Sequence, residues 1–89
     1  MRVTLKELNE MIQGLNGRYN LDDQTAVKFV MGRAYGGHKL DLREKKTGGR
    51  HDITYGFVTK KELKQAIYNI NFDGLDYLVN KCLNNGSKV

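Results

Sequence analysis

Two short stretches of the chain combine glycines with basic side chains, a composition that suits contacts with phosphate groups. They are residues 32–39 and 45–50, and their cations are Arg33, Lys39, Lys45, Lys46 and Arg50. Neither has the G-x-x-x-x-G-K-[ST] spacing of a P-loop, and both precede predicted strands rather than helices. They are interpreted either as ordinary glycine turns or as basic loops that reach phosphates or acidic side chains. Tyr35 adds a stacking group to the first.

A third basic element begins the second predicted helix. Lys60, Lys61 and Lys64 stand in its first turns. Lysines at this end oppose the positive pole of the helix dipole, so their placement suggests contact with phosphates. An ordinary solvent-exposed helix face is the alternative.

The positive charge of the whole chain is concentrated in its middle. Residues 28–64 hold ten lysines and arginines against four acidic residues, a net charge of +6, whereas the chain as a whole carries +5. A field of one sign attracts an acidic partner, although it also fits a solubilising surface. The candidate binding residues are Lys28, Arg33, Tyr35, Lys39, Arg43, Lys45, Lys46, Arg50, Lys60, Lys61 and Lys64.

The residues that could support catalysis or metal binding form no motif. His38 and His51 each begin a predicted strand and could be cross-strand neighbours, with Asp41 and Asp52 beside them. A zinc site needs three or four ligands, and no spacing here supplies them. Cys82 lies on a predicted apolar helix face, where cysteine behaves as a small hydrophobic residue. We therefore expect no catalytic residue, no metal, no cofactor and no enzymatic activity.

Capping signals and apolar periodicity predict three helices. Thr4 with Glu7 begins a helix over residues 5–15, and Thr59 with Glu62 begins another over residues 60–70. The first helix is expected to end at Asn16-Gly17, because glycine tolerates the left-handed conformation. The third helix follows residues 72–74 and ends at Asn85-Gly86; its apolar stripe is Leu75, Leu78, Val79, Cys82 and Leu83. The similarity of the first two helix starts reflects either duplication or convergence on one capping solution.

Alternating apolar and polar residues predict strands between the first two helices. They cover residues 26–31, 38–43 and 52–57, and a short fourth strand is possible at 18–21, before an Asp22-Asp23 turn. The predicted fold class is α+β, in the order α-β-β-β-α-α. A three- or four-stranded antiparallel sheet carries the helices on one face.

Length and composition set the domain organisation. With 89 residues, the chain is expected to form one globular domain over residues 1–86, followed by a frayed tail at 87–89. No apolar run reaches the roughly 18 residues of a membrane span, and the start of the chain lacks an apolar signal region. The single cysteine fits a reducing compartment. We expect a cytoplasmic protein with no membrane partner.

Two resemblances bear on function. Residues 56–66 resemble the part of double-stranded-RNA-binding domains where a strand leads into a lysine-rich helix, which implies phosphate contacts for Lys60, Lys61 and Lys64. The loop lacks that family's Gly-Pro-x-His signature, and a third helix is appended. Over residues 18–70, an aromatic-Gly-Gly strand, a later Gly-Gly turn and the helix start at residues 58–63 resemble small phage and prophage open reading frames.

The second resemblance implies a mobile-element protein in the cytoplasm of a bacterial host. Small proteins of this kind often inhibit or redirect host machinery, and some anti-CRISPR proteins share the α-β-β-β-α-α order. The sequence therefore predicts a non-enzymatic phage accessory protein that binds nucleic acid or a host nucleic-acid-binding protein. The alternative is an inhibitor that binds a host or bacterial defence protein.

Overall fold

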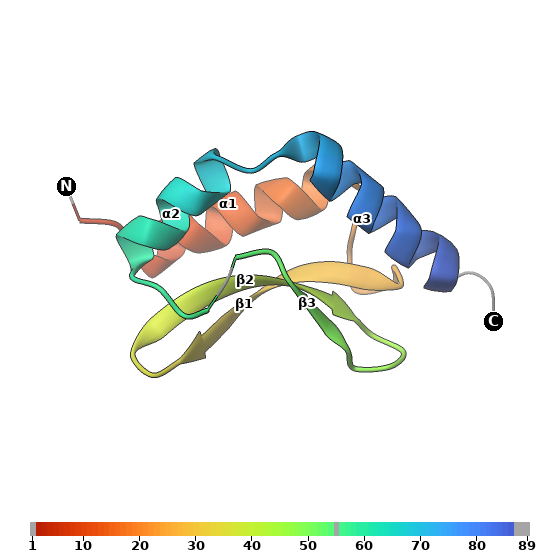
Figure 1. Ribbon diagram of the computed structural model, residues 1–89, viewed down its shortest axis with the longest axis horizontal. Coiled ribbons are helices and arrows are strands. Elements are labelled where there is room, and N and C mark those ends of the chain that lie inside the picture. Colours follow the sequence, from red (N-terminus) through yellow and green to blue (C-terminus); the bar gives the residue numbers. More distant parts are fainter. Residues whose placement is uncertain (1, 55, 87–89) are drawn as a thin grey trace.

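Three helices cover one face of a three-stranded antiparallel sheet, which confirms the α+β prediction (Figure 1). The computed structural model describes residues 2–54 and 56–86. The elements are α1 (Leu5–Arg18), β1 (Val27–Ala34), β2 (Gly37–Glu44), β3 (Arg50–Asp52), α2 (Lys60–Tyr68) and α3 (Phe72–Gly86). The strands lie in the order β1-β2-β3. The predicted tail at residues 87–89 lies outside the described residues.

Side-chain hydrogen bonds begin α1 and α2 at the predicted threonines. The capping box of α2 is complete: Thr59 Oγ1 accepts from the Glu62 amide at 3.1 Å, and the Glu62 carboxylate accepts from the Thr59 amide at 3.3 Å. At α1, Thr4 accepts from the Glu7 amide at 3.1 Å. The Glu7 carboxylate instead pairs with Lys64 Nζ at 3.1 Å, so it joins α1 to α2.

The end of α1 lies beyond the predicted stop at Asn16-Gly17. Asn20 takes the left-handed conformation, with φ at 55°. The amides of Leu21 and Asn20 donate to the carbonyls of Asn16 and Gly17, at 2.8 and 3.3 Å. These bonds form a Schellman motif, in which Asn20 takes the left-handed position that Gly17 was expected to fill. The possible strand at residues 18–21 is therefore wrong, because these residues form the end of the helix.

The first two strands are longer than the alternating pattern predicted, and the third lies earlier in the chain. The third strand was predicted over residues 52–57, but β3 covers Arg50–Asp52. The amide of Ile53 still donates to the Leu40 carbonyl, at 2.9 Å, and Val58 forms an isolated bridge with His38. Tyr55, part of the predicted alternation, lies outside the described residues.

One apolar core fills the space between the sheet and the helices. Val27, Phe29 and Met31 of β1 and Leu40 and Leu42 of β2 point into it, as the alternation predicted. The buried apolar residues are Leu8, Ile12, Leu15, Leu21, Val27, Phe29, Leu40, Leu42, Leu63, Ile67, Leu75, Val79 and Cys82. Within the described ranges, no helix combines the length and the hydropathy needed to cross a membrane.

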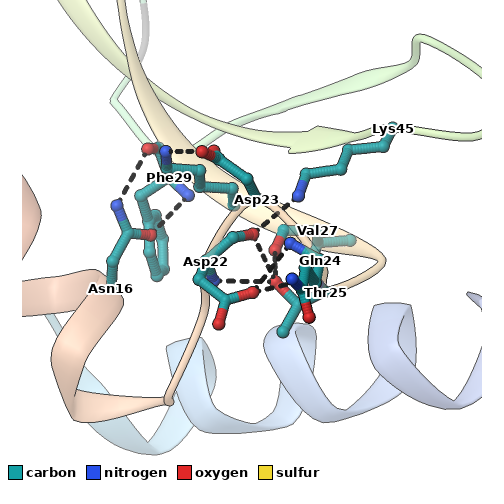
Figure 2. Close-up of polar contacts among 9 residues, drawn as sticks. Asn16, Asp22, Asp23, Gln24, Thr25, Val27, Phe29 and Lys45 are labelled. Carbon is teal, nitrogen blue, oxygen red and sulfur yellow. Dashed lines mark hydrogen bonds and ion pairs between the residues drawn. The ribbon is translucent and has the colours of Figure 1, made fainter.

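A buried side chain connects α1 to the outer edge of the sheet. The Asn16 amide nitrogen donates to the Phe29 carbonyl at 3.2 Å, and its oxygen accepts from the Phe29 amide at 2.8 Å (Figure 2). β1 is an edge strand, so these peptide groups have no neighbouring strand on that side. Asn16 thus supplies both hydrogen bonds that a further strand would make there, and it holds α1 against the sheet.

Replacing Asn16 by alanine is expected to lower the free energy of unfolding by about 2–4 kcal/mol, because two buried peptide groups lose their partners. Urea denaturation of the N16A variant measures this loss. Asn9→Ala, at an exposed position of the same helix, is the matched control and should change stability by less than about 0.5 kcal/mol. Equal stabilities of the two variants would contradict the proposed connection.

Candidate nucleic-acid interface

The face of the sheet that the helices do not cover carries a row of three cations. Lys28 on β1 lies opposite Arg43 on β2, and Arg43 lies opposite Arg50 on β3. Side chains directly opposite on one face stand about 5 Å apart, and like charges in such pairs destabilise a sheet. Carboxylates or a bound anion beside the row would offset this repulsion.

A buried carboxylate compensates part of this charge. Asp41, also on the uncovered face, is 0% exposed and lies 3.4 Å from Lys39 Nζ and 3.6 Å from Arg50. Lys39 Nζ also donates to Asp52, the cross-strand partner of Asp41, at 2.9 Å. Lys39, Asp41, Arg50 and Asp52 therefore form one charged cluster.

A glycine makes room for this cluster. Gly32 lies opposite Lys39, and a Cβ at that position would stand 3.1 Å from Lys39 Cγ and 3.2 Å from an Asp41 carboxylate oxygen. Both distances are shorter than ordinary side-chain contacts. The missing side chain allows Lys39 to lie flat over the sheet and to cover Asp41 from solvent.

The two carboxylates of the cluster differ in proton affinity. Burial raises the pKa of Asp41 above its usual value of 3.8, and the charge of Lys39 offsets only part of this effect. The hydrogen bond from Lys39 lowers the pKa of Asp52. Asp52 therefore loses its proton at a lower pH than Asp41 does.

Three further cations of the predicted set have partners within the protein. Lys28 pairs with Asp23 at 2.8 Å, and Lys64 pairs with Glu7. Lys45 Nζ donates to the Asp22 carbonyl at 2.6 Å, across the turn in which the Asp22 carboxylate accepts two backbone amides (Figure 2). Among the described residues, no carboxylate pairs with the remaining candidates, Arg33, Arg43, Lys46, Lys60 and Lys61.

The β1–β2 turn presents an aromatic side chain to solvent. Tyr35 and Gly36 both have positive φ, 54° and 73°, the signature of a two-residue type I′ turn. The Tyr35 side chain is 97% exposed and meets Phe57 edge to face, with ring centroids 5.8 Å apart. Lys39 Nζ lies 5.1 Å from the centre of the Phe57 ring. Two aromatic rings and a cation thus meet at one end of the sheet.

Two more cations, Arg33 and Lys60, lie near His38 at this end of the sheet. The amide and carbonyl of His38 pair with Val58, each at 2.8 Å, which brings the start of α2 to this end of the sheet (Figure 1). Burial lowers the pKa of His38, and the charges of Arg33 and Lys60 lower it further. We call the group formed by Arg33, Tyr35, Lys39, Phe57 and Lys60 the aromatic tip.

The predicted binding residues therefore do not form one continuous patch. At the aromatic tip, Arg33 and Lys60 lie near His38, Tyr35 forms the adjacent turn, and Lys39 lies beside Phe57 on the other face of the sheet. Lys28, Arg43 and Arg50 form the row on the uncovered face. Lys45 and Lys46 lie in the β2–β3 turn, at the opposite end of β2. Lys61 and Lys64 continue along α2. Phe57 was not predicted as a site residue, because its sequence pattern reads as one more apolar strand position.

The two histidines are not neighbours. His51 lies opposite Leu42, four positions along β2 from His38, or roughly 13 Å at the rise of a strand. His51 instead meets Glu44 and Cys82, and the potential ligand atoms of the three lie within 4.8 Å of one another. Burial, and then the charge of Glu44, raise the pKa of the Cys82 thiol. Spacing along the chain carries no signal of this group, because α3 supplies one member.

Comparisons with protein-family models, with curated proteins and with solved structures found no match.

Replacing Asp41 by asparagine tests the charged cluster through its pH dependence. Because the folded state raises the pKa of Asp41 above 3.8, the folded protein binds its proton more tightly than the unfolded chain does. The free energy of unfolding of the wild type, relative to D41N, should therefore fall as the pH rises from about 4 to about 7. Denaturant titrations of both proteins across this range measure the difference. A wild-type advantage that grows with pH would contradict the assignment.

Proposed function

We propose that this protein is a non-enzymatic accessory protein of phage type that binds single-stranded or unpaired nucleic acid. In this proposal a base stacks on Tyr35 and Phe57 at the aromatic tip, and the phosphates meet the neighbouring cations. Stacking on aromatic rings together with a basic track is how many proteins hold single strands, because every base offers a π-face.

The conformation of Tyr35 carries the proposal. The first position of a type I′ turn requires positive φ, which favours asparagine, aspartate or glycine. A bulky aromatic residue at positive φ is unusual and costs stability, and such strain concentrates at functional sites. The side chain does not recover this cost by burial, since it is almost wholly exposed. Its place on the surface is better explained by a partner than by folding.

The charge around the tip supports nucleic acid as that partner. Arg33 and Lys60 flank the turn, and neither pairs with a carboxylate among the residues that the structure describes. Phosphate groups of a nucleic acid would neutralise both charges. On the uncovered face, Arg43 stands between Lys28 and Arg50 and extends the basic surface away from the tip.

A second candidate function, inhibition of a host or defence protein, is favoured by a groove on the helix side. The groove has a volume of about 610 Å³ and runs between α2, α3 and the segment that follows β3. Its apolar lining comes from Ile53, Val58, Ala66, Ile70, Leu75 and Leu78. A groove of this kind suits an apolar segment of another protein. A partner held there would remain bound after nuclease treatment, whereas nucleic acid would not.

Tyr35→Asn separates binding from folding. Asparagine suits the turn, so we expect the free energy of unfolding to stay within about 1 kcal/mol of the wild type. Loss of the stacking ring should weaken binding of a labelled single-stranded oligonucleotide by about 5- to 150-fold, as fluorescence anisotropy would measure. Tyr77→Ala, which removes another largely exposed ring, on α3, is the control and should bind as the wild type does. Unchanged affinity of Y35N would refute the proposal.

The double variant Arg33→Gln/Lys60→Gln tests the phosphate contacts. Each lost contact should lower the salt dependence, so the slope of log K against log salt should fall in magnitude by about 1.4 for a single strand. Titrations at several salt concentrations give this slope. Lys6→Gln/Lys81→Gln, with two exposed helix cations removed, carries the same change in net charge and should keep the wild-type slope. Binding that shows no salt dependence in the wild type would contradict the mechanism.

A further inference from the structure

Three side chains with different ligand atoms converge where the end of the sheet meets α3. Glu44 ends β2, His51 lies in β3, and Cys82 comes from α3. All three potential ligand atoms lie within 4.8 Å of one another, and His51 Nε2 stands 3.5 Å from Glu44 Oε2. Figure 1 shows α3 running toward the end of the sheet at which β2 turns into β3. The cluster therefore joins segments that are far apart in the sequence.

The distances are close to those of a tetrahedral metal centre. Zinc binds sulfur at about 2.3 Å and nitrogen or oxygen at about 2.0–2.2 Å, so neighbouring ligand atoms stand about 3.3–3.7 Å apart. The histidine–carboxylate pair already has this separation. Closing the cluster around an ion shortens any of these separations by about 1.5 Å at most, within the reach of side-chain rotation.

Ligand chemistry selects the metal. A thiolate and an imidazole exclude calcium and magnesium, which take oxygen ligands. Sulfur, nitrogen and oxygen together suit zinc, which favours sites built from Cys, His and Asp or Glu.

The surroundings of the three groups leave them available to an ion. His51 Nε2 is shielded from solvent and makes no hydrogen bond among the described residues, although its partner Glu44 lies nearby. A shielded nitrogen with no hydrogen bond normally costs stability, and coordination would remove that cost. Cys82 is 3% exposed, whereas the side chains of His51 and Glu44 are 40% and 27% exposed, so the cluster lies just below the surface on the side of His51 and Glu44.

We infer that Glu44, His51 and Cys82 form a zinc site that fastens α3 to the β2–β3 hairpin, with a fourth coordination position open to water or to a partner. The site lies at the opposite end of β2 from the aromatic tip, so it stands independently of the proposed function. Because the ligands come from three separate elements, zinc binding would stabilise the folded chain.

Thermal unfolding of the untagged chain with and without zinc tests the site. Zn²⁺ in modest molar excess over the protein should raise the melting temperature by about 5 °C or more, whereas the same concentration of Mg²⁺ should not. Co²⁺ reports the ligand type, because a thiolate ligand adds a sulfur-to-cobalt charge-transfer band. We expect this band in the wild type and its loss in Cys82→Ser.

The variants separate coordination from packing. Cys82→Ser, His51→Asn and Glu44→Gln should each reduce the zinc-induced rise in melting temperature. His38→Asn removes the distant histidine and should keep the rise, even if its starting melting temperature is lower. The inference fails if zinc shifts the wild type no more than magnesium does. It fails equally if the shift survives in both C82S and H51N, or if the cobalt complex lacks the thiolate band.

Discussion

The burial of Asp41 on the face of the sheet that no helix covers determines how the charge of this protein is arranged. A carboxylate withdrawn from water needs cations, and Lys39 and Arg50 provide them while Asp52 shares Lys39. This requirement fixes Lys39 flat across the strands and makes Gly32 necessary beneath it. Together with the pairs that Lys28, Lys45 and Lys64 form elsewhere, it separates basic residues that have partners within the protein from those that remain available. Of the cations in the middle of the chain, Arg33, Arg43, Lys46, Lys60 and Lys61 belong to the second group within the described residues.

The same division places the binding proposal at the end of the sheet rather than over its whole basic region. Lys39 contacts Asp52 and also lies beside the Phe57 ring, so it connects the charged cluster to the aromatic tip. The bridge between His38 and Val58 brings the start of α2 to the same place, which adds Lys60. The strained turn that exposes the Tyr35 ring thus lies at the end of a sheet whose buried carboxylate is compensated within the protein. Support of this kind is what a recognition surface needs.

The sequence predicted the element order because its signals are local. Thr59 and Glu62 form a complete capping box, and the alternation around Phe29 and Leu42 places the buried face of the sheet correctly. The errors occurred where tertiary contacts decide the outcome. Asn16 bonds the peptide groups of Phe29 from within the helix, so the helix continues past it. Asn20 then takes the left-handed position at the helix end. The partners of the candidate cations depend on strand register, and the meeting of Cys82 with His51 depends on how α3 packs. Neither can be derived from spacing along the chain.

The most direct test of the central claim is to map where a short single-stranded oligonucleotide binds, by following backbone amide signals in NMR spectra during a titration. The proposal predicts that the largest shifts occur at residues 33–39, at Phe57 and at Lys60, with smaller shifts along the row that contains Arg43. Shifts confined to the groove between α2 and α3, or no shifts at saturating oligonucleotide, would contradict it.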